Sequence, residues 1–219
     1  MNPKYSIDKM LERNAQQDCI IPGCNKKRSA LTRYCSAHNY RRRQFGSPYG
    51  YRVKPNDVRL ERIKAEHIVK NNQDHPAIEM GCSYFQNWIE QAQAQAPGIC
   101  AAKEFRRLGE DGVSGEDLFI EVIAVALFAE ANPDTVPQNE GPEPYQIALA
   151  LAVLCFKKGV KRGAKCIGHI KISSETRREV GKVLWNDLSR VIVQVKSAIQ
   201  EREKEEEAKL YKQQQRFIF

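Results

Sequence analysis

The sequence has no apolar run long enough to cross a membrane. Its two most apolar segments, residues 117–131 and 144–157, both fall short of the roughly 20 residues that a membrane-spanning helix requires. The opening stretch MNPKYSIDKMLERNAQQD also lacks the apolar centre of a secretory signal. We therefore expect a cytoplasmic protein with no membrane partner, in which cysteines stay reduced.

Familiar catalytic motifs are missing as well. There is no glycine-rich Walker loop, no serine or cysteine nucleophile motif and no cluster of carboxylates. An HNH nuclease core needs His and Asn side chains around a divalent metal, and the only candidates are His67, Asn71, Asn72 and His75. These four lie close together at the end of one expected helix, whereas that core spans a hairpin and a helix. A metal-dependent HNH-like nuclease is therefore an alternative that the sequence does not favour.

Four of the seven cysteines are scattered singly and follow no pairing pattern. We expect Cys82, Cys100 and Cys155 to be small core residues. Cys166 and His169 repeat a Cys-x2-His spacing, but no other ligand lies near them in the sequence. A second metal site at these two residues therefore stays an open alternative.

The other three cysteines form a pattern with a histidine in the string CIIPGCNKKRSALTRYCSAH. Cys19 and Cys24 flank a Pro-Gly turn, and Cys35 and His38 are spaced by about one helical turn at the start of an expected helix. Three Cys and one His at such spacings are typical of a closed, tetrahedral structural site. The sequence therefore predicts one structural Zn²⁺ ion bound by these four side chains.

Positive charge is concentrated around this expected metal site. Residues 1–56 carry a net charge of +9, which leaves −1 for residues 57–219 out of the total of +8. Basic clusters of this kind are typical of proteins that bind a polyanion, and Arg suits phosphate oxygens and guanine edges. We expect a nucleic acid, DNA rather than RNA, to contact the nine basic residues of this stretch: Lys26, Lys27, Arg28, Arg33, Arg41, Arg42, Arg43, Arg52 and Lys54.

Tyrosines lie between these charges. Tyr34 and Tyr40 flank the metal ligands, and we expect them to complete a small core around the metal. For Tyr49 and Tyr51 two roles remain open: packing in the small core, or stacking on unpaired bases. The helix that begins near Cys35 should end near Gly46, which leaves one or two of its arginines facing solvent or a ligand.

Residues 18–50 resemble the small treble-clef zinc fingers that occur in bacteriophage proteins, often ahead of HNH endonuclease cores. The resemblance rests on a Gly-Cys knuckle, a Cys-x2-His helix start, a basic helix and a Gly-x-Pro turn. The matching residues are Gly23-Cys24, Cys35, His38, Asn39-Tyr40, Arg41 to Arg43 and Gly46-Ser47-Pro48. It implies a phage or mobile-element protein acting in a bacterial host cell, with a finger that faces nucleic acid.

The rest of the sequence predicts a mostly α protein. We expect a basic zinc-finger module over residues 1–56, a helical core domain over 57–173, and a long helix over 174–219 that packs on the core or on a partner. The expected helices are bounded by Pro, Gly or Asn. They cover residues 57–71, 76–96, 99–108, 117–131, 144–157 and a final helix of some forty residues from about Ser174.

The final helix is apolar in its first half only. Leu184, Leu188, Val191, Val195 and Ala198 follow a three-four spacing, whereas residues 201–207 are mostly acidic and expected to be solvated. We expect a protein partner or self-association through this helix, which would also hold the apolar end at 217–219. A second basic stretch, residues 155–171, could extend the contact with a phosphate backbone.

These patterns together predict a zinc-finger protein of a phage or mobile element that binds nucleic acid. Its expected role is an accessory or regulatory factor in transcription, replication or DNA processing. One alternative is the HNH-like nuclease. The other is a zinc-stabilised factor that docks on a protein assembly of host or phage, such as RNA polymerase.

Overall fold

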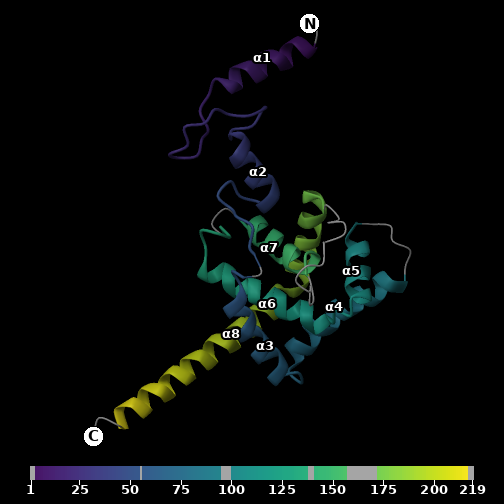
Figure 1. Cartoon of the computed structure of the whole chain (residues 1–219), viewed down its shortest axis with the longest axis vertical. Helices are drawn as coiled ribbons and strands as arrows, with labels where there is room; N and C mark the ends of the chain where they lie inside the picture. The colour runs from purple at the N-terminus through teal and green to yellow at the C-terminus, as the bar shows by residue number, and fades with distance from the viewer. Residues whose placement is uncertain (1–2, 55, 95–99, 138–140, 157–171, 217–219) are drawn as a thin grey trace, which may run out of the picture.

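The computed structural model describes residues 3–54, 56–94, 100–137, 141–156 and 172–216. Within these residues the protein is mostly helical and ends in a long helix, so the predicted fold class is confirmed (Figure 1). The helices run in the order α1 Pro3–Ala15, α2 Ser36–Phe45, α3 Arg59–Asn71, α4 Pro76–Ala94, α5 Cys100–Glu110, α6 Gly115–Ala131, α7 Glu143–Leu154 and α8 Ser174–Arg216.

Six of these helices lie where Pro, Gly and Asn punctuation predicted them, and α2 begins after Cys35 and stops before Gly46 as expected. Helix α1 was not predicted, although Ile7, Met10 and Leu11 follow a helical spacing in its sequence. Helix α6 starts two residues earlier than expected. Ser114 accepts a hydrogen bond from the backbone N–H of Asp117, whose side chain accepts one from the Ser114 N–H.

The core is built around α6, which is buried on nearly every side. It contacts α3, α4, α7 and α8, and α7 in turn packs along α8. Helices α7 and α8 approach each other closely at Gly181, where an added Cβ would lie 2.3 Å from the carbonyl oxygen of Gln146. None of the helices over the described residues is both long and apolar enough to cross a membrane.

Helix α8 has two parts. Its N-terminus is capped by Ser173, whose Oγ accepts a hydrogen bond from the backbone N–H of Thr176. Buried residues continue as far as Ile199, after which the helix leaves the body and points away from it (Figure 1). Ala198, expected on the buried stripe, is exposed, because Ile199 occupies the buried position beside it.

The scattered cysteines divide between core and surface. Cys82 is half-buried against the core, and burial raises the pKa of its thiol to about 11. The prediction for Cys155 was wrong: α7 ends at Leu154, so Cys155 lies past the helix and is exposed. The Cys100 side chain, Cys166, His169, most of the basic stretch 155–171 and the apolar end 217–219 lie outside the described residues.

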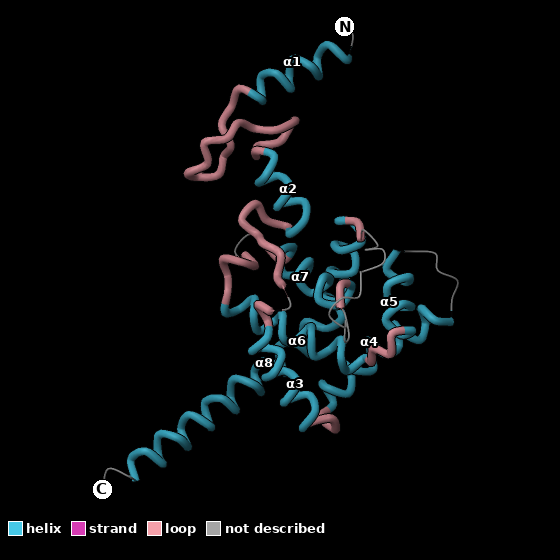
Figure 2. Tube along the Cα trace, in the orientation of Figure 1, coloured by secondary structure: helices cyan, strands magenta, loops and turns pink. Residues whose placement is uncertain are grey.

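The N-terminal part of the chain forms a separate small unit. Its apolar cluster consists of Cys19, Ile21 and Cys35, with Tyr34 packed against it, and is distinct from the main core. Between α1 and α2 the chain is irregular, and no strand is assigned in the described residues (Figure 2). The unit reaches the body through α2, which contacts α7.

We predict that residues 57–219 fold without the N-terminal unit. All buried residues of the main core lie between Val58 and Ile199, so the fragment retains the contacts that stabilise it. Its thermal midpoint should fall by a few degrees, because Phe45 and Tyr51 no longer cover Pro144 and Ile147. Circular dichroism of the fragment tests this, and a disordered chain would show instead that the N-terminal unit is part of the folding core.

Candidate metal centre and cationic surface

The four predicted ligands come together in the structure. Their ligand atoms all lie within 4.8 Å of one another. Cys24 Sγ lies 3.8 Å from Cys35 Sγ, and the Nδ1 of His38 lies 3.4 Å from Cys19 Sγ and 3.3 Å from Cys35 Sγ. Among the described residues this is the one group of three or more Cys, His, Asp or Glu arranged to hold a metal ion.

The first two ligands lie on a knuckle closed by backbone hydrogen bonds. The N–H of Cys19 donates to the carbonyl of Lys26 at 2.9 Å, and the N–H of Arg28 donates to the carbonyl of Gln17 at 2.9 Å. Between these pairs the chain reverses at Gly23, whose φ of 74° favours glycine. The reversal brings Cys24 back beside Cys19.

The other two ligands are placed by the start of α2. Cys35 is the N-cap residue, and its carbonyl accepts the N–H of Asn39 at 2.9 Å, so His38 lies one turn further along the same face. The two halves of the site are joined by a bond from the N–H of Ile20 to the carbonyl of Arg33 at 3.1 Å. All four ligands are therefore held by local backbone structure.

The pKa values of two of the thiols are shifted in opposite directions. Burial acts to raise the pKa of Cys35, but hydrogen bonds from the His38 backbone and from neighbouring thiols outweigh it, so its net pKa is lowered. For Cys24, a backbone hydrogen bond from Lys26 acts to lower the pKa. Desolvation and the nearby sulfurs act to raise it and outweigh that hydrogen bond, so the net pKa of Cys24 is raised. Thiolates this close repel one another, and a metal ion removes that repulsion.

His38 is suited to act as a neutral ligand. Burial lowers the pKa of its imidazole, and the nearby charges of Arg41 and Lys26 lower it further. The neutral ring has one nitrogen without a proton, which is the form that binds metals.

The distances fit a small tetrahedral ion. Bonds of about 2.3 Å to sulfur and about 2.0 Å to nitrogen in a tetrahedron place two sulfurs about 3.8 Å apart and sulfur and nitrogen about 3.5 Å apart. The separations of 3.8, 3.4 and 3.3 Å match these values closely. Three sulfurs and one imidazole are a poor donor set for Ca²⁺ or Mg²⁺, which prefer oxygen.

The nine predicted basic residues do not all remain available to a ligand. Lys27 pairs with Asp18 at 2.9 Å, and the Nε of Arg28 donates to the carbonyl of Asp18, so these two brace the knuckle. The acidic partner, Asp18, lies before the basic stretch in the sequence. The other exposed members are Lys26, Arg33, Arg42, Arg43, Arg52 and Lys54, and in the described part of the chain no ion pair involves them.

The arginines of α2 differ in their surroundings. Arg41 is half-buried, with its guanidinium 4.4 Å from the ring centroid of Tyr51. The exposed Arg42 lies 5.7 Å from the Tyr34 centroid. Tyr34 joins the small core as predicted, but Tyr40 is 61 % exposed, because it lies on the outer face of α2. Tyr49 and Tyr51 are exposed too.

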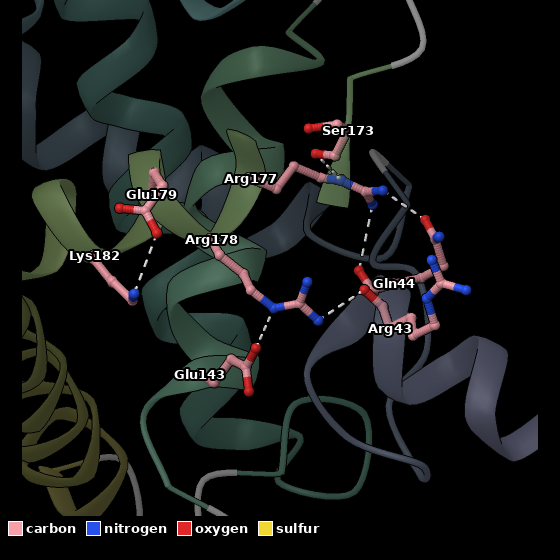
Figure 3. Close-up of polar contacts among 8 residues, drawn as sticks. All are labelled: Arg43, Gln44, Glu143, Ser173, Arg177, Arg178, Glu179 and Lys182. Carbon is pink, nitrogen blue, oxygen red and sulfur yellow. Dashed lines mark hydrogen bonds and ion pairs between the residues drawn. The ribbon is translucent and has the colours of Figure 1, made fainter. Parts of the chain in front are cut away.

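Two arginines of α8 hold the far end of α2, as Figure 3 shows. The Nη1 and Nη2 of Arg177 donate to the carbonyl and to Oε1 of Gln44 at 3.3 and 2.5 Å, and Arg178 donates to the carbonyl of Arg43 at 3.0 Å. Arg178 also pairs with Glu143 at the start of α7. No local sequence signal marks these contacts, because the partners lie more than 130 residues apart in the chain.

The loop after α2 packs tightly on the body. Gly46 has a φ of 78° and its N–H donates to the carbonyl of Arg42 at 3.0 Å, which ends the helix. An added Cβ at Gly46 would lie 2.8 Å from the backbone nitrogen of Pro144. Glycine is therefore required here for both its conformation and its size.

Three of the residues considered for a nuclease lie on α3, at its end or at the start of α4. His67 is exposed on α3, and the Nδ1 of His75 accepts the N–H of Ala77 at the start of α4. Asn72 ends α3 with its Nδ2 donating to the carbonyl of Ile68. These roles belong to a helix end and a helix start, as the sequence indicated for residues 72–76.

Comparison of the chain with protein-family models, with curated proteins and with solved structures finds no match in any of the three. The function is therefore inferred from the residues and the geometry of the site.

We predict that the purified protein holds one tightly bound metal ion per chain. Replacing two of the four ligands in Cys24→Ser with Cys35→Ser should reduce the content to near zero, because the remaining pair cannot close a tetrahedral site. Elemental analysis measures the content. Cys82→Ser, which alters a half-buried thiol of α4, is the control, and metal that persists at one per chain in the double variant would contradict the assignment.

Proposed function

We propose that the N-terminal unit binds one Zn²⁺ ion and presents the exposed arginines of α2 to a nucleic acid. The observation that carries this proposal is the combination of a Cys3His cluster with six exposed cations that lack acidic partners among the described residues. The cluster holds the backbone of the unit in place. The exposed cations supply a surface that a negatively charged ligand can bind.

Zinc is favoured over other metals by the donor set. Thiolate and imidazole are ligands that suit Zn²⁺. Zn²⁺ has no geometric preference from its d-electrons, is usually tetrahedral in structural sites, and is not redox-active. Protein side chains would fill all four coordination positions of the ion, which leaves none for water or a substrate. The ion would therefore have a structural role, and it would supply the stability that a core of three buried apolar residues lacks.

A nucleic acid is favoured over an acidic protein by the kind and arrangement of the charges. Arg42 and Arg43 project from the last turn of a helix held at both ends, and the backbone of nucleic acid supplies regularly spaced phosphates that pair with guanidinium forks. Tyr40 on the same helix and Tyr49 in the loop after it are exposed, so both offer aromatic faces for unpaired bases.

The wider role follows from the arrangement of the chain. The similarity to phage treble-clef fingers supports an accessory or regulatory factor of a phage or mobile element, acting in transcription, replication or DNA processing. The helical body contributes no catalytic constellation in its described residues. The projecting half of α8 offers a surface through which the protein could dock on an assembly, and docking of the zinc unit on a protein is the second candidate function.

We predict that Arg42→Ala with Arg43→Ala weakens binding to a 20-base-pair DNA duplex irrespective of its sequence. Both side chains are exposed and have no ion pair among the described residues, so the fold should not change. If each contacts one phosphate, the slope of log K against log salt should flatten by about 1.8. Fluorescence anisotropy at several salt concentrations measures both quantities, and a single-stranded RNA of equal length compares the two polymers.

The matched control removes the same charge from the body. Arg59 and Lys103 are exposed on α3 and α5, and their double replacement by Ala should leave the slope within about 0.3 of wild type, because no contact is lost. If both double variants bind like wild type with zinc retained, the docking of this unit on a protein becomes the better account.

A further inference from the structure

A groove lies between the C-terminal half of α4, the start of α5 and the first turns of α8, and its volume is about 540 Å³. The buried Phe105 and the half-buried Trp88 line it, and their rings meet edge to face with centroids 4.9 Å apart. Small side chains leave the hollow open, because Ala92, Ala101 and Ala102 occupy the facing positions of α4 and α5. The described residues thus leave a mainly apolar groove open to an occupant.

Helix α8 forms an acidic wall of this groove. Glu175, Glu179 and Val183 are spaced by four residues, so they share one face of the helix, and all three line the groove. Glu179 pairs with Lys182 (Figure 3), whereas no ion pair involves the exposed Glu175 within the described residues. None of the described lining residues is basic. The groove therefore matches an occupant that is apolar on one side and carries positive charge beside it.

Helix α1 has a surface of this kind. Ile7, Met10 and Leu11 lie on one side of the helix, and the first two are 49 % and 51 % exposed. Arg13 lies one turn beyond Met10, is exposed, and takes part in no ion pair over the residues that the structure describes. A helix of 13 residues is marginal in water without packing. Its uncovered apolar side therefore favours docking on another surface.

The position of α1 directs it toward another molecule. The Nδ2 of Asn14 donates to the carbonyls of Ala30 and Thr32 at 2.6 and 2.8 Å, which holds the end of α1 on the metal-binding unit. Figure 1 shows α1 extending from that unit away from α4 and α5. In this arrangement α1 does not reach the groove of its own chain, so a groove on a second copy is the one available to it.

We propose that α1 of one molecule docks in the groove between α4, α5 and α8 of a second copy. Ile7 and Met10 cover the apolar lining at Trp88, in the manner of an amphipathic helix in a groove. Arg13 lies along the acidic wall, where Glu175 supplies an unpaired carboxylate. When the exchange is reciprocal, the dimer has two-fold symmetry and contains two such contacts. This self-association goes beyond the proposed function and requires no nucleic acid.

The first experiment measures self-association of the full chain by sedimentation velocity after nuclease treatment. We expect a reversible monomer-dimer equilibrium for wild type. Val183→Asp places a charge in the apolar lining and should weaken the dimer at least about tenfold. Val193→Asp is the matched control, because Val193 is an exposed valine of α8 that does not line the groove. A wild-type chain that stays monomeric through the micromolar range, or equal effects of the two substitutions, would overturn the proposal.

The second experiment tests whether α1 is the occupant. Ile7→Ser with Met10→Ser alters exposed positions of α1, so the fold should persist while the dimer weakens. This variant keeps an intact groove, and Val183→Asp keeps an intact α1. A mixture of the two regains one of the two contacts, so it should associate more tightly than either variant alone. If the mixture associates no better than its components, the wild-type dimer forms through another surface or another segment, and the docking of α1 in this groove is refuted.

Discussion

The anchoring of α2 at both ends is the constraint on which the rest of this structure depends. At its start, Cys35 and His38 belong to the Cys3His cluster, and at its end the carbonyls of Arg43 and Gln44 accept hydrogen bonds from Arg177 and Arg178. A helix of ten residues is too short to be stable alone in water. Because tertiary contacts hold each end, its exposed arginines keep a fixed direction relative to the body.

The two anchors differ in their physical nature. At the start of α2, three thiols and one imidazole converge at separations that suit a single tetrahedral ion. At its end, the guanidinium groups sit at the negative pole of the helix dipole and satisfy carbonyls that have no partner within the helix. The first anchor thus belongs to the local fold of the unit, whereas the arginines set its orientation on α7 and α8.

The helices of the body could be predicted from sequence because Pro, Gly and Asn mark their ends, and the four metal ligands because their spacing is local. Features that depend on tertiary packing could not. The apolar run through Cys155 hid the end of α7 at Leu154, and Tyr40 looks like a core residue beside the ligands although it faces outward. Arg177 reads as an ordinary polar position of an amphipathic helix, because its partner Gln44 is 133 residues away.

The burial of Arg177 also bears on how firmly α2 is held against the body. Enclosing a guanidinium among neutral acceptors has a desolvation cost, which the contacts of α2 with the body must exceed for the unit to remain docked. Gln44 supplies two of these acceptors, so the hydrogen bonds form only while the end of α2 lies against the start of α8. The enclosure of Arg177 therefore depends on the position of α2.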